Sequence, residues 1–143
     1  GVWEKAADGE FSQWRDTADG SVALIVILDQ LPLNMFRSDP KGFQTENMAV
    51  EVALNAIKNG FDEELNDEKL LFLFMPLMHS ENIDHQNLQV YLFDKYNFNL
   101  EFSKHHRDLV KKFGRFPHRN EILGRMSTME ELDYLLSDNA FKG

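Results

Sequence analysis

The sequence feature that most constrains the fold is the run LLFLFMPLM, which occupies residues 70–78. Asn66 precedes it, and an asparagine side chain can accept hydrogen bonds from the free N–H groups of a helix N-terminus. A helix that carries so many apolar residues has no polar face for solvent, so it must be buried nearly all round. Pro76 removes one backbone hydrogen bond and predicts a kink. The run therefore predicts a central helix with other helices packed around it.

Helix-length blocks with terminal signals lie on both sides of this run. Thr45 is suited to cap a helix that passes through residues 48–57 and ends at Gly60 in a left-handed turn. Two more helices are expected over residues 82–96 and 99–113, and Gly114 ends the second. The segments predict an all-α fold of six to eight helices.

Two further segments complete this pattern. Thr128 and Glu131 have the spacing of a capping box and predict a last helix that continues through Leu132, Leu135 and Leu136. The run VALIVIL, residues 22–28, is rich in β-branched residues and would suit a buried strand. Its helical neighbours favour a helix instead.

Length and composition favour one domain in a reducing compartment. A chain of 143 residues can bury a core without staples, and it contains no cysteine, which excludes disulfides and thiolate chemistry. The two longest apolar runs, residues 22–28 and 70–78, are much shorter than the roughly 20 residues that a membrane span needs. Neither follows a basic signal-peptide head. We therefore expect a cytoplasmic protein with no membrane association.

Charge is distributed unevenly along the chain. The formal net charge is −9, but residues 101–125 contain seven lysines and arginines against three acids, so this window is +4 and the remainder −13. A negative protein is a poor partner for nucleic acid or an anionic membrane. A local positive patch suits one small anion or the carboxylate of a partner. Lys104, Lys111 and Lys112 are also explained as a solvated helix face.

The most unusual segment is FGRFPHRNEILGR, residues 113–125. Pro117 is suited to the first turn of a short helix over residues 118–123, whose free N–H groups would hold an anion. His118, Arg119 and Asn120 would add side-chain donors. Arg115 is a further candidate ligand-binding residue, although it could instead neutralise the C-terminus of the preceding helix.

His106 is the best candidate for a histidine that reaches this loop. It falls within the apolar stripe of the helix over residues 99–113, where a histidine is more often a satisfied core residue than a catalyst. If Gly114 and Pro117 fold the loop back, however, Arg115, His118 and Arg119 would share a concave site with His106. At least one carboxylate, Asp29 or Glu81, is expected at this site.

Polar residues also follow the two apolar runs. Asp29 and Arg37 suit an ion pair that fixes the turn, with Asn34 as a cap; the functional alternative makes Asp29 a carboxylate that faces His106 or His118. His79 and Arg37 are also candidate ligand-binding residues. Glu81 would cap the next helix or hold a histidine tautomer.

Two other kinds of site are disfavoured by sequence spacing. The triplet His79, Ser80 and Glu81 cannot form a serine-hydrolase triad between sequence neighbours, and no GxSxG motif occurs. The five histidines lack a metal-binding spacing such as HExxH, so neither a metal nor another cofactor is expected.

Three segments together resemble one known family. VALIVILDQLPLNMFRSDP, LFMPLMHSEN and HHRDLVKKFGRFPHRNEILGRMSTMEE are similar to the uncharacterised bacterial family called domain of unknown function 924. The resemblance implies a tetratricopeptide-like helical fold and no established activity. It also implies an aromatic-rich N-terminal segment that residues 1–143 lack. Leu33 and Ser38 stand where the family commonly has Arg and Gly, which weakens the case for a cation from the first segment.

Two classes of function remain open. The first is a binding module with an Arg- and His-lined polar pocket for a small anionic ligand or a peptide carboxylate. The second is an enzyme that uses His106 or His118 as general acid and base, Asp29 or Glu81 to orient it, and Arg115 and Arg119 to stabilise negative charge. The sequence lacks a recognisable nucleophile and a phosphate-binding loop, and this favours the binding module. It does not predict the oligomeric state.

Overall fold

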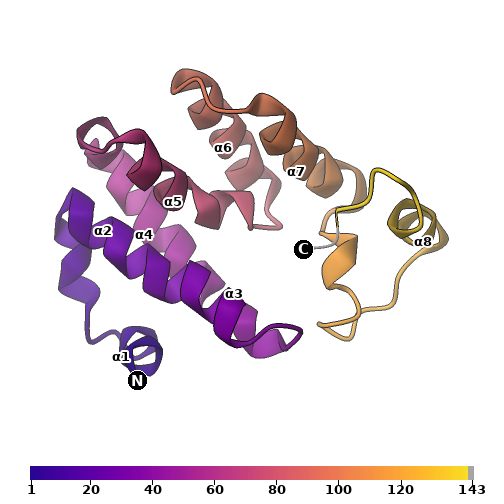
Figure 1. Cartoon of the computed structure of the whole chain (residues 1–143), viewed down its shortest axis with the longest axis horizontal. Helices are drawn as coiled ribbons and strands as arrows, with labels where there is room; N and C mark the ends of the chain where they lie inside the picture. The colour runs from indigo at the N-terminus through magenta and orange to yellow at the C-terminus, as the bar shows by residue number, and fades with distance from the viewer. Residues whose placement is uncertain (142–143) are drawn as a thin grey trace.

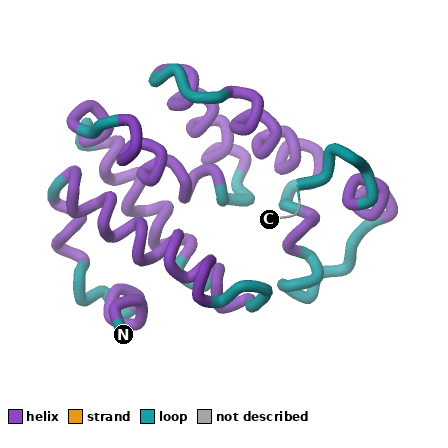
Figure 2. The backbone as a smooth tube through the Cα atoms, in the orientation of Figure 1, coloured by secondary structure: helices purple, strands orange, loops and turns teal. Residues whose placement is uncertain are grey.

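The computed structural model describes residues 1–141, and this part of the chain is helical with no strand (Figures 1 and 2). The prediction of an all-α fold is confirmed. The eight α-helical segments are α1 (Val2–Ala7), α2 (Ala18–Ile25), α3 (Leu31–Met35), α4 (Glu46–Lys58), α5 (Asp67–Met78), α6 (Ile83–Lys95), α7 (Leu100–Phe113) and α8 (Met129–Leu135). Short 3₁₀ segments lie between them: η1 (Ser12–Asp16), η3 (Pro40–Phe43), η4 (Phe61–Glu64) and η5 (Pro117–Arg119). The tetratricopeptide-like arrangement stays a prediction.

The VALIVIL run is helical, as expected, but its second half widens into a π-helix, η2 (Val26–Gln30), which joins α2 to α3. Pro32 has no N–H to offer the carbonyl of Leu28 four residues earlier. The hydroxyl of Thr45 donates to that carbonyl instead, at 2.6 Å. Thr45 also accepts a bond of 3.1 Å from the indole N–H of Trp3. The prediction that its side chain caps α4 is therefore wrong, although α4 does begin immediately after it.

The predicted central helix is confirmed as α5. Leu73, Phe74 and Leu77 are fully buried within the main apolar cluster, to which α2, α4 and α6 also contribute. Pro76 lies inside the helix. Since α5 packs against α2, α4, α6 and α7, its C-terminal end is a fixed point on which surrounding residues can converge.

Most predicted helix ends are confirmed. Asn66 accepts a bond from the backbone N–H of Lys69, and both bonds of the capping box between Thr128 and Glu131 are present. Gly60 and Gly114 have φ of 74° each, the left-handed conformation expected at these ends. These positions follow from local backbone chemistry, which explains why the sequence identifies them.

A second, smaller apolar cluster contains Leu109, Val110 and Phe116, with Phe113, Tyr134 and Phe141 packed around it. It lies at the C-terminal end of α7, and α8 lies beyond it at the far end of the molecule from α1 (Figure 1). The last helix ends at Leu135, so Leu136 lies just outside it and is exposed. The loop of residues 114–127 contributes Phe116 to this cluster, and its Arg119 reaches Glu46 at the start of α4.

Candidate functional site

The loop of residues 114–127 is held in place by three pairs of arginine and glutamate. Arg115 binds both carboxylate oxygens of Glu131 at 2.9 and 2.7 Å, and it also donates to the carbonyl of Met126. Bonds from Arg115, with help from Thr128 and Asn120, lower the pKa of Glu131 to about 2. The guanidinium of Arg115 is therefore used by groups of the chain itself. Its partner is the capping glutamate of α8.

Glu81 anchors the opposite side of the loop. It accepts the backbone N–H of Phe116 at 2.6 Å and two bonds from Arg125 at 2.8 and 2.9 Å. Burial would raise the pKa of Glu81, but these donors outweigh burial and lower it. Asn82, not Glu81, caps α6, and the bonds described for Glu81 go to Phe116 and Arg125 and not to a histidine. Glu81 does contact the loop, as one of the two carboxylates expected there. The backbone N–H of Phe116 therefore binds an internal carboxylate.

Arg119 is the third anchor, and it is 5% exposed. Its Nη1 donates to both oxygens of Glu46 at 3.2 and 3.1 Å, and its Nη2 donates to the carbonyl of His79 at 2.6 Å. The guanidinium also lies over the rings of Phe43 and Phe116. The short helix predicted over residues 118–123 is instead the single 3₁₀ turn η5, followed by turns. Asn120 is equally internal, bound to Ser127, Glu131 and Arg125.

Asp29 faces a histidine, but not one of the two expected. It lies in the π-helix and accepts bonds from Nδ1 of His79 at 3.1 and 3.0 Å, and from Gln30. Neither an ion pair with Arg37 nor a cap from Asn34 is present; Arg37 is exposed and Asn34 lies within α3. The Asp29 carboxylate is 2% exposed and the His79 ring 23%, so one ring edge is fixed and the other reaches towards solvent.

His106 and His118 do converge, as predicted. Both rings pack near Phe116, with centroids 5.7 and 5.5 Å away, and both contact Phe141. Burial lowers the pKa of His106 to about 4, even though its ring nitrogen bonds the carbonyl of Phe102. Burial, reinforced by Arg119, likewise lowers the pKa of His118 to about 4. Both rings are therefore neutral near pH 7, and the predicted stripe position of His106 is confirmed at 2% exposure.

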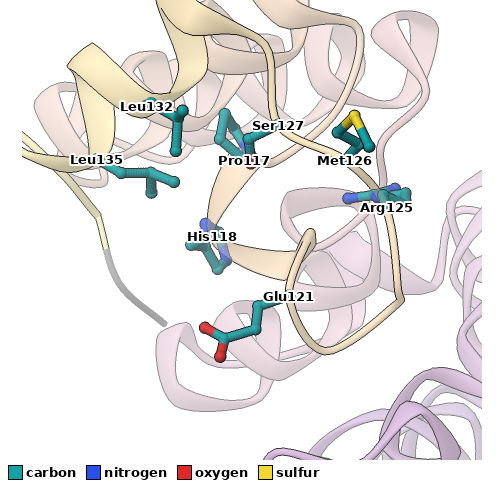
Figure 3. Close-up of a pocket in the computed structure, with 8 residues that line it drawn as sticks. All are labelled: Pro117, His118, Glu121, Arg125, Met126, Ser127, Leu132 and Leu135. Carbon is teal, nitrogen blue, oxygen red and sulfur yellow. The ribbon is translucent and has the colours of Figure 1, made fainter.

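His118 also lines a cavity of about 560 Å³ between the loop and α8, which we call the loop pocket (Figure 3). Leu132 and Leu135 of α8 form one apolar wall, and Met126 adds to it. The polar lining consists of His118, Glu121, Arg125 and Ser127. Nδ1 of His118 is buried and has no hydrogen-bond partner in residues 1–141. Arg115, Arg119, Asn120, His79 and Arg37 do not line this pocket.

Several residues of this region were not identified from the sequence. Glu46, Glu131 and Arg125 complete the ion pairs, and Phe141 packs on both histidines. The capping-box pattern accounted for Glu131 at the start of α8 and did not indicate that its carboxylate also pairs with Arg115. Glu46 and Arg119 lie 73 positions apart, a separation that no local pattern spans.

Two other findings concern the described residues as a whole. No group of three or more metal-ligating side chains occurs in residues 1–141. In the same part of the chain, none of the helices has the length and apolar character needed to cross a membrane. Lys104, Lys111 and Lys112 are all exposed, which confirms the solvated helix face.

The model of the bacterial protein family of unknown function 924 matches residues 1–139. The chain belongs to this family. A solved structure of a protein of unknown function from Agrobacterium tumefaciens is 36% identical, with a TM-score of 0.89 over 94% of this chain and 77% of that one. No curated protein matches the chain. At Ser38, where the family commonly has glycine, the backbone φ is 59°, a conformation that glycine would adopt without strain.

Proposed function

We propose that this member of the family is a helical binding module whose ligand lies in the loop pocket. The ligand is a small anion with an apolar body, or the carboxylate end of a peptide. The observation that carries the proposal is the lining of the pocket, where an apolar wall from α8 faces His118 and Ser127. A pocket with apolar walls and a few convergent polar groups is the usual form of a small-molecule site.

The polar groups suit a carboxylate for a specific reason. Ser127 accepts a bond from the side-chain amide of Asn120, so its own O–H can donate to a ligand. The neutral ring of His118 offers a second donor, and a bond to its unpartnered nitrogen would remove the cost of leaving that atom unsatisfied. The arginines have a different role from the ligand-binding role predicted from the sequence. Arg115 and Arg119 hold the loop in place through internal ion pairs and do not line the pocket, whereas Arg125 lines it and is paired with Glu81.

Hexanoate is a suitable first probe, because it combines an apolar chain with one carboxylate. We expect it to perturb backbone NMR signals of residues 117–135 and to bind at least about tenfold more weakly to a His118→Ala/Ser127→Ala variant, because two hydrogen bonds to a charged group are lost. Lys112→Gln, which removes an exposed charge outside the pocket, is the matched control. Unchanged binding in the double variant, or loss of binding in the control, would contradict the proposal.

The enzyme alternative also has one observation in its favour, the pair of Asp29 and His79. A buried carboxylate that binds Nδ1–H fixes the tautomer and leaves Nε2 to exchange protons, as in general acid and base catalysis. This version uses His79, where the sequence had suggested His106 or His118. If a screen of esters and phosphoesters finds turnover, we expect His79→Gln to lower kcat at least about 100-fold. Equal turnover by that variant would exclude this role.

A further inference from the structure

Five rings meet beside α7. Phe102 and His106 lie on α7, and Phe116 and His118 lie on the loop; we call these four side chains the aromatic box. Their neighbouring centroids are 4.5 Å apart for Phe102 and His106, 5.7 Å for His106 and Phe116, and 5.5 Å for Phe116 and His118. The fifth ring, Phe141, contacts three members of the box.

Phe141 meets these rings by their edges or at steep angles. Its centroid is 4.8 Å from His106, 4.9 Å from His118 and 6.1 Å from Phe102, with interplanar angles of 62°, 83° and 77°. Edge-to-face contacts of this kind are favourable between aromatic rings because the positive edge of one meets the negative face of another. The box therefore recognises an aromatic ring specifically, beyond offering apolar space.

The box and its occupant come from different parts of the chain. The four box residues are held by α7 and by a loop that three ion pairs fix, whereas Phe141 reaches the box from the segment after α8. The backbone of Phe141 is attached at one described point, a bond of 2.7 Å from its N–H to the hydroxyl of Tyr134. A rigid box is thus filled by a segment with few attachments, which a ligand could displace.

We propose that the aromatic box binds an aromatic ring of the ligand, and that Phe141 occupies the box when ligand is absent. This inference rests on the proposed function, since the box and the loop pocket share His118. The ligand class is a small aromatic carboxylate, with its ring in the box and its carboxylate next to His118 and Ser127. Withdrawal of Phe141 also uncovers the His118 ring, whose Nδ1 is buried and unpartnered while Phe141 is docked.

The test compares 3-phenylpropionate with hexanoate by calorimetry on the unaltered chain and on Phe141→Ala. If Phe141 is docked nine-tenths of the time, its removal strengthens binding of 3-phenylpropionate about tenfold, because only the undocked fraction is competent. The saturated analogue 3-cyclohexylpropionate should bind Phe141→Ala more weakly than 3-phenylpropionate does, since it lacks the ring quadrupole. Leu136→Ala, at an exposed position in the same part of the chain, is the matched control and should gain nothing.

A second variant keeps the test decisive if Phe141→Ala lowers stability. Phe102→Ala/Phe141→Ala removes a wall of the box and should lose the gain in affinity for 3-phenylpropionate. As an independent readout, NMR titration of Phe141→Ala should show the pKa values of His106 and His118 rising towards 6.5, because burial is what lowers them. The charged and titratable groups around the two rings, namely His79, His105, Glu81, Arg119 and Arg125, are unchanged in this variant.

The outcomes separate this inference from the proposed function. Equal affinity of the unaltered chain and Phe141→Ala for 3-phenylpropionate, or equal affinities of Phe141→Ala for 3-phenylpropionate and its cyclohexyl analogue, would overturn the aromatic box. If hexanoate still binds in the loop pocket in that case, the proposed function stands without it. If neither probe binds Phe141→Ala while its fold is intact, both proposals fail.

Discussion

Leu73→Asp is expected to leave the domain unfolded at neutral pH. Leu73 is fully buried in α5, the helix against which α2, α4, α6 and α7 pack. An unpaired buried carboxylate costs several kcal/mol, while the whole stability of a domain of this size is about 5 to 15 kcal/mol. Circular dichroism and a thermal melt measure the outcome, which should be the absence of a cooperative transition.

The matched control is Leu71→Asp, two residues earlier in the same helix, where the side chain is 38% exposed. It places the same charge in the same helix but at the surface, so it should melt cooperatively with a modest loss of stability. A normal melting curve for Leu73→Asp would show that α5 is not the centre of the fold.

The helix ends were predictable from sequence because they depend on neighbours along the chain. Asn66 and the pair of Thr128 and Glu131 satisfy backbone groups within three residues of themselves. Thr45 shows where such reasoning stops. Its hydroxyl donates to the carbonyl of Leu28, which cannot accept a backbone bond from Pro32. Thr45 and Leu28 are 17 positions apart. A local pattern cannot show that a side chain has already been used by a distant group.

The same limit explains which contacts of the candidate site could be predicted from the sequence and which could not. The prediction that His106 and His118 converge is confirmed, since it needed only a helix face and a reversal at Gly114 and Pro117. The predicted pairing of Asp29 with Arg37 was wrong, because such a pair depends on which helix ends meet in space. Asp29 reaches His79 across 50 positions, and Glu46 reaches Arg119 across 73.

The many cationic side chains of residues 113–125 had two explanations: they could donate hydrogen bonds to a ligand, or they could pair with carboxylates of the chain itself. The structure provides an internal glutamate for each of Arg115, Arg119 and Arg125. Each of these pairs joins the loop to a different helix or helix end, through Glu131, Glu46 and Glu81 respectively. The acidic remainder of the chain therefore supplies the counter-charges of its basic segment.

Arg119→Ala is expected to lower the free energy of unfolding by about 3 to 5 kcal/mol, because it leaves the largely buried carboxylate of Glu46 unpaired. The sequence alone had placed Arg119 among the ligand-binding residues. We now expect hexanoate affinity per folded molecule to be unchanged, since Arg119 does not line the loop pocket. Urea unfolding and calorimetry measure the two quantities separately. The control Arg107→Ala removes an exposed pair with Asp108 and should cost at most about 1 kcal/mol.

The pH dependence of stability and a second substitution identify why Arg119→Ala lowers the free energy of unfolding. Burial already raises the pKa of Glu46 against the opposing effect of Arg119, so without Arg119 the folded state favours the protonated acid further. A folded-state pKa above the unfolded value adds stability as pH falls, so the deficit of Arg119→Ala should shrink between pH 7 and pH 5. Glu46→Gln in the Arg119→Ala background should recover part of the deficit at pH 7, because it removes the unpaired charge. A deficit that neither low pH nor Glu46→Gln reduces would assign the loss to the stacking of Arg119 on Phe43 and Phe116 instead.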